Sequence, residues 1–276
     1  MFVKTRSLEI GAFKLTLMFL FSTFFQVVVS ELLCKLLKYL NVYMIVAMDF
    51  AVSSIPIFIL FQIGKKLFRT SEDETDRILK KGALMLLFPL LVIFFSLYYG
   101  IFLLFANLTA GLFTRTFEEK IIFWHFSENV DLAVILISYG LYIFLQRKNE
   151  KFKGFLGIFI MSAIGIFFLV EAVNNALDLR VYYTKGKEAL YEPCVVESLI
   201  KEKYVRGGVD FYVKCKGKKK EGISSIFLYS FFCKTKENSL NFDFNCQKKE
   251  IEGKEVFLIK SLYSDTIYGL RLAEEL

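Results

Sequence analysis

The chain has 276 residues, of which 55% are hydrophobic and 17% aromatic, and its formal net charge is +7. Residues 8–176 are dominated by Leu, Phe, Ile and Val, whereas residues 177–276 hold 18 of the 35 Lys and Arg residues. This division argues against a single soluble domain and predicts a polytopic α-helical membrane part, residues 1–178, followed by a small β-rich domain, residues 179–276. In a membrane protein the positive charge concerns orientation and lipid headgroups, so the bilayer is an expected partner and nucleic acid is not.

Five stretches approach the roughly 20 apolar residues that a transmembrane helix needs. They are residues 12–34, 41–64, 82–106, 130–146 and 154–175. The first could instead be a signal peptide, because Lys4 and Arg6 precede it, but Val28-Val29-Ser30 is a poor cleavage site. We therefore expect five transmembrane helices.

The Lys and Arg residues of the predicted loops indicate the orientation. With a cytoplasmic N-terminus, twelve of them lie in cytoplasmic segments and four in outer loops, and the loop Lys65–Lys81 alone contributes six. The C-terminal domain is then extracytoplasmic, and periplasmic in a Gram-negative cell. The abundance of Phe and Lys, with three Pro and one His, resembles the composition that an AT-rich bacterial genome encodes, so we expect an inner-membrane protein.

Asp49 lies mid-way along the second predicted helix, where a charge is costly and usually faces protein or water. Ser53 follows at i+4 and shares its face. Two interpretations remain open: a proton or cation site, or a neutral Asp that holds helices together through a hydrogen bond. We expect the second, with Ser53, Ser54, Ser138 or Tyr139 as the partner.

The predicted outer loop, residues 107–129, contains apolar and aromatic residues at helical spacing. These are Phe117, Ile121, Ile122 and Trp124. Because tryptophan favours the headgroup level, we expect a separate helix that lies on the outer membrane surface.

The residues give little support for catalysis. The only histidine, His125, lies in this aromatic segment, and one histidine cannot supply the clustered ligands of a metalloprotease, even with Glu118 and Glu119 nearby. The sequence has no phosphate-binding glycine loop and no kinase or hydrolase motif. We expect no enzyme, no cofactor and no metal centre.

Four polar residues at the outer end of the fifth predicted helix follow one another at i, i+3, i+4 and i+7. They are Glu171, Asn174, Asn175 and Asp178. Oxygen ligands on one face could bind a cation. We expect instead the water-facing side of a helix that leaves the bilayer.

The C-terminal domain shows the alternation of apolar and polar residues that is typical of half-buried strands. Residues 209–215 and 240–246 alternate most clearly. Further strands are predicted near residues 194–201, 223–233, 255–261 and 266–272, with a turn at Lys216-Gly217. The basic run Lys214–Gly222 could bind anionic lipids, but a solvated hairpin tip is the simpler interpretation.

The same domain contains four of the five cysteines, Cys194, Cys215, Cys233 and Cys246. An even number in a small extracytoplasmic domain predicts two disulfides, with buried free thiols as the alternative and a metal site disfavoured by the spacings. Cys215 and Cys246 end strands on inward faces, so we favour Cys215–Cys246 and Cys194–Cys233 among three possible connectivities.

The leading hypothesis is a non-enzymatic membrane protein whose outer β-rich domain binds another protein, as an accessory, assembly or immunity-type subunit. The alternative is a small transporter or channel component that uses Asp49.

Overall fold

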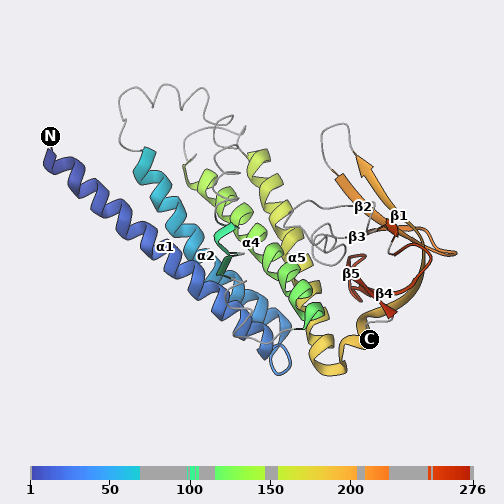
Figure 1. The fold of residues 1–276 in the computed structure, drawn as a ribbon. Coiled ribbons are helices and arrows are strands. Elements are labelled where there is room, and N and C mark those ends of the chain that lie inside the picture. Colours follow the sequence, from blue (N-terminus) through green and yellow to red (C-terminus); the bar gives the residue numbers. More distant parts are fainter. Residues whose placement is uncertain are drawn as a thin grey trace, which may run out of the picture. The chain divides into compact units, whose positions relative to one another are not determined.

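Figure 1 shows the computed structural model of the chain, which describes residues 2–68, 98, 100–102, 104–105, 116–146, 155–203, 209–223, 248–249 and 251–273. The chain divides into two compact units. The helical unit comprises Met1–Arg115 and Ser127–Val170, and the β unit comprises Thr116–Phe126 and Glu171–Leu276.

Four helices of the described residues are long and apolar enough to cross a membrane. They are α1 (Phe2–Leu36), α2 (Val42–Phe68), α4 (Phe117–Gln146) and α5 (Phe155–Lys185). Of the third expected helix, residues 82–106, the structure describes residues 98, 100–102 and 104–105, which are helical, and the remainder lies outside the described residues.

Helix α4 differs most from the expectation. It runs unbroken from Phe117 to Gln146, so the prediction of a separate surface helix followed by a short span from residue 130 is wrong. Ile122, Phe123 and Phe126 are fully buried rather than lying on a membrane surface. Residues 127–129 were assigned to the end of a loop, but Ser127 and Asp131, one helical turn apart, are both buried on one face of the helix.

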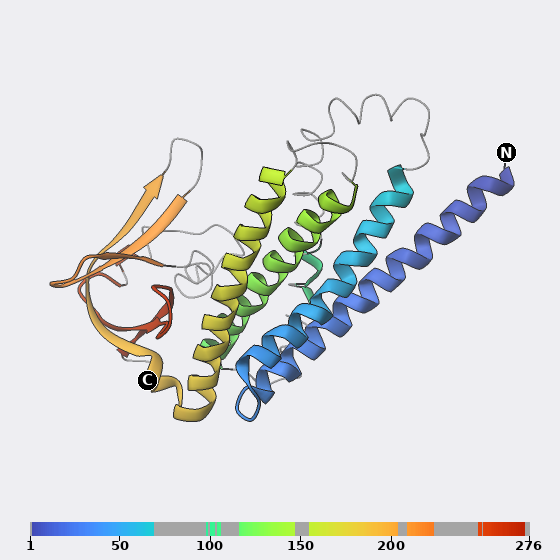
Figure 2. The ribbon, with the colours of Figure 1, turned by 180° about the vertical axis from the view of Figure 1, so that it is seen from behind.

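Helices α1 and α2 lie side by side and antiparallel (Figures 1 and 2). The Asn41 side chain begins α2 by accepting a hydrogen bond from the backbone N–H of Tyr43 at 2.9 Å. Apolar side chains are buried on either side of the polar middle of this pair. They are Leu33, Leu37, Val42, Ile45 and Val46 toward the connecting turn, and Phe19 and Ile57 toward the other end.

Helices α4 and α5 of the helical unit approach closely at Gly165. A Cβ atom added there would lie 2.7 Å from Ile137 Cγ1 and 3.3 Å from Leu136 Cβ. Small residues allow such backbone approach between helices in membranes, so Gly165 sets how closely the two helices pack.

In the β unit, the five described strands form a closed barrel in the order β1-β2-β3-β5-β4. The strands are β1 (Tyr191–Lys203), β2 (Val209–Cys215), β3 (Lys220–Ile223), β4 (Glu255–Lys260) and β5 (Ile267–Leu272). All neighbouring strands are antiparallel except β3 and β5, which pair in parallel at Ile223 and Ile267. The short 3₁₀ helix Lys187–Leu190 connects α5 to β1.

Strand burial follows the alternation that the sequence predicted. Phe211, Val213 and Cys215 of β2 are buried, and Gly217, with φ of 77°, forms the expected turn to β3. In β1 the buried positions change from Cys194 and Val196 to Leu199, because a bulge shifts the register between Val196 and Ser198. The expected strand 240–246 and most of 223–233 lie outside the described residues.

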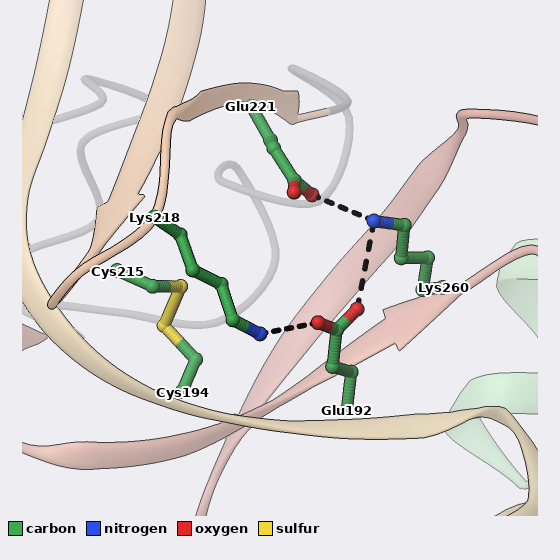
Figure 3. Close-up of a disulfide and its surroundings, with 6 residues drawn as sticks. All are labelled: Glu192, Cys194, Cys215, Lys218, Glu221 and Lys260. Atoms are coloured by element: carbon green, nitrogen blue, oxygen red, sulfur yellow. Dashed lines mark hydrogen bonds and ion pairs between the residues drawn. A yellow bond between two sulfur atoms is a disulfide. The ribbon is translucent and has the colours of Figure 1, made fainter.

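A disulfide joins Cys194 of β1 to Cys215 of β2, with the Cα atoms 5.5 Å apart (Figure 3). The expectation of a disulfide is thus confirmed, but the favoured pairing of Cys215 with Cys246 and of Cys194 with Cys233 is wrong. Alternation identified the face of Cys215 but not its neighbouring strand, which is β1. Cys233 and Cys246 lie outside the described residues.

Candidate functional site

The helical unit contains a buried polar cluster, which we define as Gln26, Ser30, Asp49, Ser53, Tyr98 and Asp131. Each of these side chains is at most 1% exposed. They come from α1, α2, the helical residues around 98 and α4. Polar groups buried this completely require hydrogen-bond partners, because a buried polar group without one is costly.

Gln26 connects three other members of the cluster. Its Nε2 donates to Ser53 Oγ at 2.8 Å and to Asp131 Oδ1 at 2.9 Å. Its Oε1 accepts a hydrogen bond from the Tyr98 hydroxyl at 2.7 Å. One amide thereby joins four helical segments of the unit.

The other carboxyl, Asp49, accepts a hydrogen bond from the Ser30 hydroxyl through Oδ1. Ser30 lies one helical turn after Gln26 on α1, and Asp49 one turn before Ser53 on α2. The Gln26–Ser53 and Ser30–Asp49 hydrogen bonds therefore connect the two antiparallel helices at successive turns. They lie near the middle of the candidate spans Lys14–Leu36 and Val42–Ile59.

One oxygen of each carboxyl group has no such contact. Asp49 Oδ2 and Asp131 Oδ2 are buried, and no described residue hydrogen-bonds to them. Asp131 is linked to the helix of Asp49 through Gln26, which donates to both Asp131 and Ser53, one helical turn from Asp49. Ser127, one turn before Asp131 on α4, adds a buried hydroxyl that likewise has no hydrogen-bond partner among the described residues.

The sequence identified part of this cluster. Asp49 and Ser53 were expected to share a face and both belong to it, but the partner of Asp49 is Ser30 rather than the four residues proposed from sequence. Ser54 instead donates to the backbone carbonyl of Ala51 within its own helix. Gln26, Ser30, Tyr98 and Asp131 were missed, although the i, i+4 spacing of Gln26 and Ser30 in an apolar stretch was a usable signal.

The four polar residues expected at the outer end of the fifth predicted helix have a different environment from the one expected. Asn175 and Asp178 are buried, so they do not face water, while Glu171 and Asn174 are half-buried. Asp178 Oδ1 accepts a hydrogen bond from the backbone N–H of Leu262 at 2.9 Å, and its Oδ2 accepts one from Ser261 at 2.5 Å. These hydrogen bonds join the helix to the β4–β5 turn within the β unit. Within the described residues no three His, Cys, Asp or Glu side chains gather as metal ligands.

Tyr268 of β5 completes this arrangement inside the β unit. Its hydroxyl lies 2.7 Å from both Asn175 Oδ1 and Asp178 Oδ2. Burial, followed by the nearby Asp178 charge, raises the pKa of Tyr268, so the phenol remains a hydrogen-bond donor. The ring of His125 lies 5.4 Å from the Tyr268 ring, which places the only histidine in an aromatic contact.

Glu118 and Glu119 also bind residues of the β unit. Glu118 Oε1 accepts hydrogen bonds from Arg271 Nη1 at 2.6 Å and from the Tyr191 hydroxyl at 2.7 Å. Tyr183 donates to Glu119 at 2.6 Å. These contacts give both glutamates a structural role within the unit.

A row of charged side chains crosses the barrel beside the disulfide (Figure 3). Glu192 pairs with Lys218 and with Lys260, and Lys260 also pairs with Glu221 at 3.0 Å. The hydrogen bond from Lys218 holds the pKa of Glu192 below its usual range. The basic run Lys214–Gly222 is thus partly neutralised by neighbouring glutamates.

Comparison of the chain with protein-family models, with curated proteins and with solved structures finds no match. The function must therefore be inferred from the residues themselves.

Proposed function

We propose that this chain is a non-enzymatic integral protein of a bacterial inner membrane, with five transmembrane helices, a cytoplasmic N-terminus and an extracytoplasmic β unit that binds another protein. The Cys194–Cys215 disulfide carries the proposal, because disulfides persist in oxidising compartments and are rare in the cytosol. The distribution of basic residues, twelve in the segments assigned to the cytoplasm and four in the outer loops, independently supports an extracytoplasmic β unit.

The turn between β4 and β5 is the candidate contact surface. It presents Leu262, which is 54% exposed, and Tyr263, which is 47% exposed. Ser261 Oγ accepts hydrogen bonds from the backbone N–H groups of Tyr263 and Ser264, while Asp178 binds that of Leu262. A preorganised turn that displays a tyrosine beside a leucine suits protein binding, because little further ordering is needed.

The test is purification of the full chain from its native membrane in mild detergent, compared with the double variant Leu262→Ser/Tyr263→Ser. We expect a stoichiometric partner with the wild type and at least tenfold less with the variant. Lys216→Ser, an exposed change in another turn of the β unit, is the control and should retain the partner. Equal recovery from all three proteins would contradict this assignment of the surface.

A second candidate, transport of a proton or small cation, is favoured by a different observation. Asp131 joins Asp49 in one buried cluster near the middle of candidate membrane spans, and each carboxyl retains an oxygen without a hydrogen bond from the described residues. Intramembrane carboxyl groups of this kind are costly and commonly mark ion pathways.

The variant Asp49→Asn distinguishes the two candidate functions, protein binding by the β unit and ion transport. In proteoliposomes, a transporter should lose ion flux while the variant still folds and inserts. A protein that only presents the β unit should show no flux in either form and should keep its partner.

A further inference from the structure

We propose that the buried polar cluster binds one dehydrated monovalent metal cation, of which Na⁺ is the representative, between the carboxyl groups of Asp49 and Asp131. The proposal deepens the transport candidate and rests on it only for the cation's purpose, since a bound cation could equally serve to hold the helices together.

The hydrogen bonds of the cluster engage only one oxygen of each carboxyl group. Ser30 occupies one oxygen of Asp49, and Gln26 occupies one oxygen of Asp131. The second oxygen of each carboxyl group is buried and accepts no hydrogen bond from the described residues. A buried carboxylate oxygen without a donor is expensive, so its natural partner is a cation.

Neutral oxygens are available to complete the shell. Ser53 Oγ and the Tyr98 hydroxyl belong to the same hydrogen-bonded cluster through Gln26. Ser127 Oγ lies one turn from Asp131 and is buried without a partner among the described residues. Hydroxyl and carboxyl oxygens are the ligands that hard cations prefer.

Dehydration and the number of available ligands favour a monovalent ion. Neither Asp49 nor Asp131 has an ion-pair partner among the residues that the structure describes, so no side chain of this part of the chain occupies the place of a cation. Mg²⁺ releases its water reluctantly and Ca²⁺ requires six to eight oxygens. Two vacant carboxylate oxygens with a few hydroxyls fit a monovalent ion better than either.

The test uses the full chain in detergent at constant pH and ionic strength. Equilibrium binding of ²²Na⁺ and thermal unfolding in NaCl are compared with unfolding in N-methyl-D-glucamine chloride. We expect one Na⁺ per chain and a Tm higher by about 5 °C in saturating NaCl.

The variants Asp131→Asn and Asp49→Asn should each weaken Na⁺ binding by about tenfold or more and remove the Tm difference. Glu128→Gln, which changes a carboxyl group on the same helix outside the cluster, should retain both. If the wild type binds no ²²Na⁺ and unfolds identically in both salts, protons or hydrogen bonds satisfy the carboxyl groups and the proposal is wrong. Na⁺ binding without flux would instead support the cation site and contradict the transport candidate.

Discussion

Gln26 is the side chain on which the polar cluster of the helical unit depends. A glutamine offers two N–H donors and a carbonyl acceptor, and the three hydrogen bonds to Ser53, Asp131 and Tyr98 use all of these functions. The neighbouring apolar residues cannot replace any of them. Loss of Gln26 would therefore leave three buried groups on three different helical segments without this partner.

We predict that Gln26→Leu, a change with little effect on volume, lowers the free energy of unfolding by about 2 kcal/mol. This value sums three intramembrane hydrogen bonds at about 0.6 kcal/mol each. Thermal unfolding in detergent provides the measurement. Ser54→Ala is the control, because Ser54 is bonded only to the carbonyl of Ala51 in its own helix; a Gln26→Leu protein as stable as this control would argue against the network.

The Glu192–Lys218 contact gives a prediction about pH. Lys218 holds the pKa of Glu192 below the ordinary value of 4.5, so this contact stabilises the fold above pH 4.5 and is lost as the pH falls through the lowered pKa. Both groups are about one-third exposed or more, which keeps the contribution below about 1 kcal/mol. In the Lys218→Ala protein the pKa should rise toward 4.5.

Carboxyl ¹³C shifts of glutamate-labelled protein, with the Glu192 resonance assigned through Glu192→Gln, follow this titration directly. Lys216→Ala removes a lysine from the same turn and should leave the midpoint unchanged. An unchanged midpoint in Lys218→Ala itself would show that the contact does not form in solution.

At the scale of helices and strands, hydrophobic pattern was informative where one face or one whole segment is apolar. It located α1, α2 and α5 and the strands β1, β2, β4 and β5. It failed at α4, because Ser127 and Asp131 are polar residues that pack inside the helical unit. The same failure concealed Asp131, which was assigned next to a loop. That Gln26 meets Asp131 and Tyr98 could not be predicted, because contacts between residues far apart in the sequence leave no local signal.

The disulfide between β1 and β2 leads to a prediction about stability. In the chain-entropy model, the sequence separation of 21 residues corresponds to about 3 kcal/mol. We expect Cys194→Ala/Cys215→Ala to lower the free energy of unfolding by about this amount, and reduced wild type to match the variant. Non-reducing peptide mapping should recover a Cys194–Cys215 cross-link; a Cys215–Cys246 cross-link in its place would contradict the barrel register.

The close approach of α4 and α5 at Gly165 leads to a prediction about helix packing. Gly165→Ala places a Cβ atom 2.7 Å from Ile137 Cγ1, so the helices must separate, and we expect a loss of about 1–3 kcal/mol in unfolding free energy. Gly100→Ala is the matched control, because a Cβ there meets nothing within 4 Å. Adding Ile137→Ala removes the contacted atom and should recover part of the loss; thermal unfolding that is equal for Gly165→Ala and Gly100→Ala would exclude a close contact.

For the whole molecule, the number of membrane spans determines the side on which the β unit lies. Four described helices are long and apolar enough to cross, and an even number would return the C-terminus to the side of the N-terminus. The fifth expected span, residues 82–106, lies largely outside the described residues but contains no charged residue over 25 positions. A disulfide in the β unit is compatible with the odd number, because disulfides persist in oxidising compartments and are rare in the cytosol.

We therefore predict that a reporter active only in the cytoplasm is silent when it is fused after Leu276 and active when it is inserted after Glu74. The reason is the excess of basic residues in the segments assigned to the cytoplasm, including the six of the loop Lys65–Lys81. An alkaline phosphatase fusion, which requires an oxidising compartment, should give the opposite pattern at both positions and serves as the control. Cytoplasmic activity after Leu276 would mean an even number of spans, and it would remove both the outer location of the β unit and the oxidising environment that its disulfide requires.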